Sequence, residues 1–221
     1  MLTAPLVVDA VLFDMDGTLV DSNATVDAMW TQFAVTLNLD PVAVRRFAHG
    51  TPSTATLGEF LPEGESFDEW FTKIAVWESG SFGHVEEVAG AIGVVESLPA
   101  DRWAVVTSAL REAARTRLKG VGFADPRVLI GADDVSRGKP DPEGFLAAAR
   151  ALGVDPTRCV VFEDSPAGLE AALASGAIAI AVGDSDAPVT HGLRRLRDWT
   201  GVTVTVDGDG RLVFDGVPAV V

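Results

Sequence analysis

The stretch that decides the fold is residues 10–22, which read Ala10-Val11-Leu12-Phe13-Asp14-Met15-Asp16-Gly17-Thr18-Leu19-Val20-Asp21-Ser22. Its first four residues are a short apolar run that ends at a polar, glycine-containing turn, a pattern typical of a buried strand. Asp14 and Asp16 then emerge at the C-terminal end of that strand, where open α/β sheets bind ligands. One carboxylate there can be a covalent nucleophile while the other moves a proton, but an anionic substrate would require positive charge nearby.

Three later segments place polar residues at the ends of further expected strands. The segment Val105–Ser108 ends in two hydroxyl side chains, whose donors suit phosphate oxygens. The segment Gly138–Pro140 carries one of only three lysines beside a proline turn. The segment Val160–Pro166 is an apolar run that ends in Glu163 and Asp164 and leads into a helix with proline at its first position. Such hard oxygen ligands suit Mg²⁺.

In order and spacing, these four segments resemble the motifs of the haloacid dehalogenase superfamily, specifically its phosphatases with a helical cap inserted after the first motif. The resemblance extends from about Val8 to Val182. It implies an α/β fold with a Rossmann-like parallel sheet core and an inserted α-helical cap domain. We expect residues 1–20 and 86–221 to form the core and residues 21–85 to form the cap.

The resemblance also implies roles for the four acidic residues. Asp14 would be the nucleophile and an Mg²⁺ ligand. Asp16 would be the general acid and base, and its main-chain carbonyl would bind the metal as well. Asp164 would complete the metal shell, with Glu163 beside it.

The remaining core motifs would bind the phosphoryl group. By the same resemblance, Thr107 and the Ser108 amide would hold it, and Lys139 would neutralise its charge and that of the nucleophile. Each motif also has a purely structural interpretation, because hydroxyls and acids favour helix starts and Asp-x-Asp-Gly occurs in turns. Four such motifs together, in the family's order, favour a single active site.

The segment that follows the first motif has a different character from the rest of the chain. Apolar residues at helical spacing predict a helix to about Leu37, which Ser22 or Asn23 can cap. Shorter helices are expected near Pro41–Ala48, Ser53–Phe60 and Phe67–Glu78. Three tryptophans at helical spacing are expected in the core of this cap, namely Trp30, Trp70 and Trp77.

A glycine-containing loop between two of these helices can expose polar groups over the cleft. The expected substrate contacts in the cap are therefore Arg45, His49, Gly50 and Thr51. A lone histidine is more often a packed or surface residue than a ligand, but the loop context of His49 evens the odds, so both interpretations stay open. Relatives often carry arginine directly after His-Gly, whereas Thr51 stands here.

After residue 83 the chain alternates between apolar runs and alanine-rich helical stretches, which predicts a parallel sheet. Its strands are expected near residues 103–107, 128–130, 160–163 and 177–182. Residues 202–206 and 212–214 flank Asp-Gly-Asp-Gly and predict a terminal hairpin.

Composition limits the partners of the protein. The 221 residues carry a net charge of −15, which argues against a nucleic-acid groove or an acidic membrane surface. Cys159 is the only cysteine and cannot form an intrachain disulfide. The sequence shows neither a signal peptide nor an apolar run of membrane-spanning length, and it predicts a cytoplasmic monomer or weak homodimer.

The expected function is Mg²⁺-dependent hydrolysis of small sugar or polyol phosphate monoesters. Within the superfamily, the motifs are most similar to glycerol-3-phosphate and 2-deoxyglucose-6-phosphate phosphatases. A β-phosphoglucomutase-like enzyme is the main alternative, but the histidine of that family would fall at about Val26. A true haloacid dehalogenase needs neither Asp16 nor Asp164. A catalytically silent protein that binds sugar phosphates is the remaining alternative.

Overall fold

Short apolar runs form a six-stranded sheet in the computed structural model, which describes residues 5–49, 51–78 and 85–219. In spatial order the strands are β6 (Leu129–Ile130), β5 (Trp103–Val106), β2 (Ala10–Phe13), β7 (Cys159–Glu163), β8 (Ile178–Val182) and β9 (Arg194–Leu196). Every neighbouring pair is parallel. The predicted α/β core with a parallel sheet is therefore confirmed.

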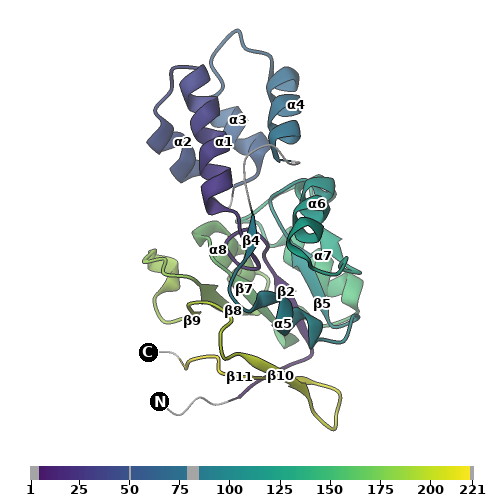
Figure 1. The fold of residues 1–221 in the computed structure, drawn as a ribbon. Helices are drawn as coiled ribbons and strands as arrows, with labels where there is room; N and C mark the ends of the chain where they lie inside the picture. Colours follow the sequence, from purple (N-terminus) through teal and green to yellow (C-terminus); the bar gives the residue numbers. More distant parts are fainter. Residues whose placement is uncertain (1–4, 50, 79–84, 220–221) are drawn as a thin grey trace.

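Side chains alternate between the two faces of this sheet, and both faces are covered (Figure 1). On β2, Val11 and Phe13 join a cluster with α5 (Ala91–Glu96) and α6 (Arg111–Val121). The intervening Ala10 and Leu12 join a second cluster with α7 (Glu143–Leu152) and α8 (Pro166–Ala174). The strands are buried on both sides, so the ends of the central strands are held rigidly.

A smaller antiparallel sheet lies at the end of the molecule opposite the helices within residues 23–78 (Figure 1). It contains β1 (Leu6–Val8), β11 (Leu212–Asp215) and β10 (Thr203–Val206) in that spatial order. The hairpin predicted near the C-terminus is confirmed by the β10–β11 pairing. Short 3₁₀ turns occupy Ala132–Asp134, Pro156–Arg158 and Pro188–Thr190.

Four helices stand apart from the sheet and pack on one another (Figure 1). This four-helix group consists of α1 (Asn23–Thr36), α2 (Pro41–Ala48), α3 (Ser53–Phe60) and α4 (Phe67–Glu78). Trp30 and Trp70 are buried in a hydrophobic cluster that the group does not share with the sheet, and Trp77 packs against it. Phe33 contacts both buried indoles edge to face. Trp30 and Trp70 therefore lie in the core of the four-helix group, as expected, and the partly buried Trp77 lies at its edge.

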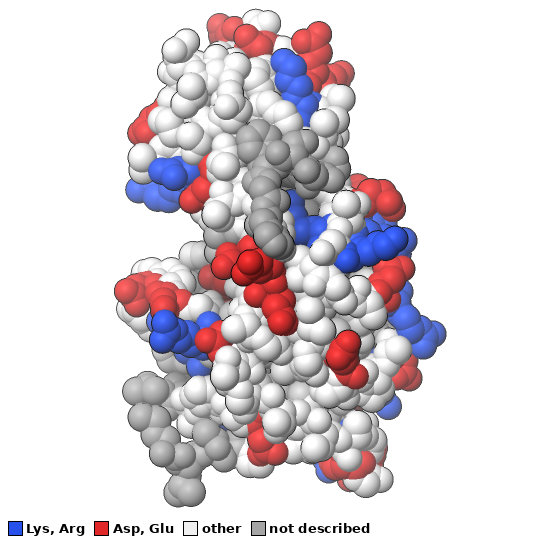
Figure 2. Space-filling model, viewed as in Figure 1, with Lys and Arg blue, Asp and Glu red and all other residues white. Residues whose placement is uncertain are grey.

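The four-helix group is joined to the rest by a short two-stranded ribbon. Its strands are β3 (Val20–Asp21) and β4 (Glu86–Glu87), which pair antiparallel. Figure 2 shows a constriction at this level, with acidic side chains on the visible face. Among the helices of the described residues, none combines the length and the apolar character needed to span a membrane.

Candidate active site

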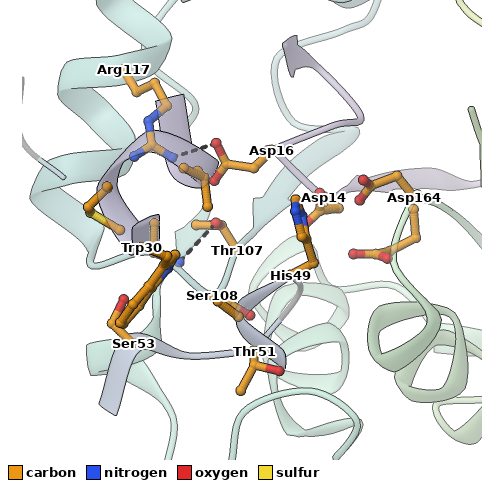
Figure 3. Close-up of a pocket in the computed structure, with 15 residues that line it drawn as sticks. Asp14, Asp16, Trp30, His49, Thr51, Ser53, Thr107, Ser108, Arg117 and Asp164 are labelled. Carbon is orange, nitrogen blue, oxygen red and sulfur yellow. Dashed lines mark hydrogen bonds and ion pairs between the residues drawn. The ribbon is translucent and has the colours of Figure 1, made fainter. Parts of the chain in front are cut away.

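Three neighbouring strands deliver the predicted core motifs to one edge of the main sheet. Asp14 follows β2, Thr107 follows β5, and Asp164 follows β7, and these strands are adjacent in the order β5-β2-β7. All three residues line a pocket between this edge and the four-helix group (Figure 3). The sequence therefore located the pocket correctly, because the carboxyl ends of parallel strands meet at the same edge.

Lys139 connects Asp14 and Glu163, two of the acidic residues that line the pocket. Its Nζ donates to Asp14 Oδ1, and it lies 2.8 Å from Glu163 Oε1. The second oxygen of Glu163 accepts hydrogen bonds of 2.8 Å from both the amide and the hydroxyl of Ser165. Both oxygens of Glu163 are thus engaged, and this residue orients the lysine.

Glycines allow the carboxylates to lie this close to the backbone. A Cβ at Gly168, in the first turn of α8, would lie 2.0–2.2 Å from the carboxylate atoms of Glu163. A Cβ at Gly17 would lie 2.0 Å from Asp164 Oδ2, and Gly17 also has a φ of +85°. Any side chain at either position would displace an acidic group from the site.

Negative charge exceeds positive charge in this cluster of Asp14, Lys139, Glu163 and Asp164. Burial raises the pKa of Asp14 well above its usual range, an effect that Lys139 opposes and that Glu163 and Asp164 reinforce. Burial also raises the pKa of Asp164, reinforced by the Glu163 charge. Burial alone would lower the pKa of Lys139, but the facing carboxylates of Asp14 and Glu163 outweigh it and raise that pKa. Three carboxylates and one ammonium leave two negative charges without a partner inside the cluster.

The donor set at this point fits a divalent cation. Oxygens of Asp14, Glu163 and Asp164 lie within 4.8 Å of one another. Asp14 Oδ2 is buried and has no hydrogen-bond partner among the described residues. A buried carboxylate oxygen without a partner is costly, and a hard cation such as Mg²⁺ would satisfy it and offset the excess charge.

Asp16 has a different set of partners from the acidic cluster. Its Oδ1 accepts a 2.5 Å hydrogen bond from Arg117 Nη1 on α6 and another from the Ser22 hydroxyl. Figure 3 shows the Asp16 side chain directed toward Arg117, away from Asp164. Among the described residues, the Asp16 carboxylate is therefore outside the cluster of side chains that could hold a metal.

Ser22 occupies the position before α1 that the sequence predicts for a capping residue. Its side chain, however, makes no capping hydrogen bond to the helix, because its hydroxyl donates to Asp16 instead. A capping hydrogen bond is worth about 1 kcal/mol, so the helix gives up this stabilisation at the edge of the site. Of the two candidate caps, Ser22 takes the N-cap position, but its side chain does not cap the helix.

Arg117 was not identified from the sequence, although a signal was present. On α6, Ala113, Ala114, Arg117 and Leu118 are the buried residues and share one face at helical spacing. A charged residue on an otherwise apolar face must find a partner when it is buried. The pattern marks Arg117 as unusual, but it does not reveal that the partner is Asp16, 101 residues away in the chain.

The hydroxyl residues after β5 lie on the pocket wall. Thr107 is buried, and its Oγ1 accepts a 3.1 Å hydrogen bond from the amide of Ala109, which fixes the turn after the strand. Ser108 follows it and also lines the pocket. Both predicted phosphoryl-binding residues therefore face the same cavity as Asp14 (Figure 3).

The predicted cap contacts fall into two groups. His49 and Thr51 line the pocket, whereas Arg45 is not among the lining residues. His49 Nε2 lies 3.0 Å from Asp27 Oδ1, and Arg45 Nη1 lies 3.7 Å from Asp27 Oδ2. Asp27, on α1, thus connects the two residues, a contact that no local sequence pattern indicates. Gly50 lies outside the described residues.

Comparisons with known proteins agree with this arrangement. The model for haloacid dehalogenase-like hydrolases matches residues 8–176. Hexitol phosphatase A from Escherichia coli is 36% identical over 215 residues, covering 92% of this chain and 97% of that protein. Glycerol-1-phosphate phosphohydrolase 2 from Saccharomyces cerevisiae is 34% identical over 183 residues, covering 77% of this chain and 73% of that protein.

A similar fold also occurs among solved structures. A hydrolase from Pseudomonas syringae superposes with a TM-score of 0.73 at 25% identity, covering 85% of this chain and 92% of that one. The match to the family model spans all four motif segments, three of which line the pocket. This chain belongs to the haloacid dehalogenase-like hydrolases.

Proposed function

We propose that this protein is an Mg²⁺-dependent phosphatase that hydrolyses small sugar or polyol phosphate monoesters through an aspartyl-phosphate intermediate. The observation that carries the proposal is the environment of Asp14. One of its oxygens is held by Lys139, and the other is buried beside two further carboxylates with no hydrogen-bond partner in the described part of the chain. A carboxylate held in this way at a strand end, facing hydroxyl donors across a pocket, suits attack on a phosphoryl group.

The reaction would proceed in two steps. In the first, an Asp14 oxygen attacks phosphorus, the ester P–O bond breaks, and Asp16 gives a proton to the leaving alkoxide. In the second, Asp16 takes a proton from a water molecule that attacks the aspartyl phosphate. Inorganic phosphate leaves, and Asp14 is restored as a carboxylate.

The other core residues would stabilise the charge on the transferring group. Thr107 and Ser108 face the pocket and would donate hydrogen bonds to phosphoryl oxygens. Lys139, which remains protonated, would offset their negative charge. Asp14 and Asp164 would hold Mg²⁺, with the main-chain carbonyl of Asp16 as a further ligand and Glu163 beside them, and the ion would supply positive charge at the equatorial oxygens.

We further infer that residues 21–85 form a cap domain and that residues 1–20 and 86–221 form the core. The separate hydrophobic cluster of α1–α4 and the paired strands β3 and β4 support this division. The cap would select the leaving group, because its residues line the pocket opposite the phosphoryl-binding motifs. His49 and Thr51 are the polar candidates, and Asp27 would orient His49.

Two considerations favour sugar or polyol phosphates. The relatives named above are a hexitol phosphatase and a glycerol-1-phosphate phosphohydrolase. The cap side of the pocket combines apolar residues with a few hydrogen-bonding side chains, as a polyol with C–H and O–H groups requires. A phosphomutase is less well supported, because apolar Val26 lines the pocket where a β-phosphoglucomutase would carry histidine.

The test is a screen of phosphorylated sugars and polyols with purified protein and Mg²⁺, in which released inorganic phosphate and isomerised sugar phosphate are measured separately. Acid quenching during turnover, followed by peptide mass spectrometry, should locate a phosphoryl group on Asp14. Isomerisation without net phosphate release would favour the mutase. Absence of turnover with every ester, including p-nitrophenyl phosphate, would contradict the proposal.

The role of the cap is tested separately with His49→Ala and Thr51→Ala, using Arg46→Ala as an exposed control on α2. Loss of one hydrogen bond of about 1 kcal/mol should change discrimination among sugar phosphates by roughly fivefold to tenfold. Hydrolysis of p-nitrophenyl phosphate should change little, because that ester lacks the hydroxyls that the cap would contact. An equal loss of hydrolysis with all esters would indicate that these residues act in cap closure rather than in substrate recognition.

A further inference from the structure

Arg117 is a buried cation that lines the pocket. Its side chain is 7% exposed and contacts Asp16 at 2.5 Å. It comes from α6 of the main sheet region, so its position does not depend on the four-helix group. A buried arginine requires a partner, and its placement beside a residue proposed to transfer protons calls for a functional explanation.

The contacts to Asp16 come from two different parts of the molecule. Arg117 belongs to α6, and Ser22 lies at the start of α1, where its hydroxyl is used for Asp16 rather than for capping. Both hydrogen bonds end on Oδ1 of Asp16. A proton that Asp16 donates or accepts would therefore be carried by Oδ2, and the orientation of the carboxylate is fixed by two donors from one side.

We propose that Arg117 is a positioning residue that holds Asp16 in the orientation required for proton transfer at the leaving-group oxygen. The inference rests on the proposed phosphatase function. Without Arg117, Ser22 would be the one described residue whose side chain still holds the Asp16 carboxylate, which could then turn toward the acidic cluster. Proton transfer depends on such geometry, because donor and acceptor must come within hydrogen-bond reach.

The proposal predicts an effect that depends on the leaving group. A poor leaving group, such as the alkoxide of a sugar or polyol, needs a proton when the P–O bond breaks, whereas p-nitrophenolate leaves without one. The parameter kcat/KM reports only the steps through phosphorylation of Asp14, so it isolates this proton transfer from the later hydrolysis. A purely structural role of Arg117 would lower kcat/KM for all esters alike.

The experiment measures kcat/KM for a series of phosphate monoesters, from p-nitrophenyl through phenyl to alkyl phosphates, with the parent and Arg117→Met. Arg115→Met is the matched control, because Arg115 lies on the same helix but pairs with the exposed Asp125 and does not line the pocket. Thermal unfolding of each variant checks the fold. Arg117→Lys, which keeps the charge, and Ser22→Ala, which keeps the buried arginine, provide second variants if Arg117→Met does not fold.

We expect Arg117→Met to lower kcat/KM for alkyl esters by about tenfold or more and for p-nitrophenyl phosphate by less than about threefold. Arg115→Met should match the parent with both. In an Asp16→Asn background, Arg117→Met should cause no further loss, because it acts through Asp16. For the second variants, Ser22→Ala should show the same leaving-group dependence, and Arg117→Lys should retain more alkyl-ester activity than Arg117→Met.

Equal losses for all esters, or the same loss with and without the Asp16 carboxylate, would overturn the positioning role. For Ser22→Ala or Arg117→Lys, an equal effect on every ester would count against it in the same way. Failure of the proposed phosphatase function would look different, since the parent itself would then hydrolyse none of the esters.

Discussion

Replacement of Gly138 by alanine should push the four-helix group away from the loop that carries Lys139. A Cβ at Gly138 would lie 2.5 Å from Pro52 Cγ and 3.4 Å from its Cδ, so the two segments touch directly across the cleft. Carbon atoms prefer a separation of about 3.5–4.0 Å, so the cap loop would have to retreat by about 1–1.5 Å. Gly138 does not adopt a left-handed φ, so alanine itself fits the backbone there.

A displacement of about 1 Å in a positioning element can lower a rate by roughly a hundredfold. We therefore expect Gly138→Ala to reduce kcat/KM for sugar phosphates by about tenfold to a hundredfold. Turnover of p-nitrophenyl phosphate, which depends on the core motifs, should fall by less than about threefold. The assay is released phosphate at several substrate concentrations, with thermal unfolding as a check on the fold.

Two further variants make this test specific. Gly120→Ala is the control, because a Cβ at that position of α6 meets no atom within 4 Å. Adding Pro52→Ala to Gly138→Ala removes the overlapping ring atoms and leaves a Cβ 3.9 Å away, so sugar phosphate turnover should recover. Parent-like activity of Gly138→Ala, or a double variant no better than the single one, would refute the reasoning. An equal loss of p-nitrophenyl phosphate turnover would mean that Lys139 had moved instead.

Three other outcomes follow from the structure. Asp14→Asn should reduce turnover by about 10⁴-fold or more without changing the circular dichroism spectrum, and activity within tenfold of the parent would exclude a covalent role. EDTA should abolish activity, Mg²⁺ should restore it, and Ca²⁺ should inhibit the enzyme. Asp164→Ala should weaken Mg²⁺ binding measured by calorimetry. Full activity without metal would contradict the proposed metal dependence. Burial raises the pKa of Cys159 from 9.0 to about 11. The folded protein should therefore react slowly with a thiol reagent at pH 8 and quickly in urea. The stability that this pKa shift contributes below pH 9 should be lost as the pH rises toward 11.

The core of the fold could be predicted from the sequence because its signals are local. The apolar run before Asp14 and those after residue 100 became strands, within one or two residues of their expected limits. The strand β9 was not predicted, because two of its three residues are arginines and it lacks an apolar run. The pairing of β1 with β11 was also missed, because it joins opposite ends of the chain and no short pattern encodes it.

The residues of the site could likewise be predicted only where the sequence signal is local. Asp14, Thr107 and Asp164 could be placed together because each follows a strand of one parallel sheet. Contacts that depend on tertiary packing could not be foreseen. Arg117 reaches Asp16 only because α6 lies against the first motif, and Asp27 reaches His49 only because α1 and α2 pack together.

The ribbon between the two parts of the molecule has a consequence for how such proteins can be rebuilt. Val20 pairs with Glu87 and Asp21 with Glu86, so the chain leaves the core and returns to it at neighbouring points. The length and content of what lies between them hardly affect those ends, because doubling a connecting loop costs only about 0.6 kcal/mol. We therefore expect residues 23–85 to be exchangeable as one segment, whereas Ser22 must stay because its hydroxyl holds Asp16. A different helical segment grafted between the same two strands would place a different pocket wall opposite the core motifs. The proposed phosphoryl transfer would then act on different substrates.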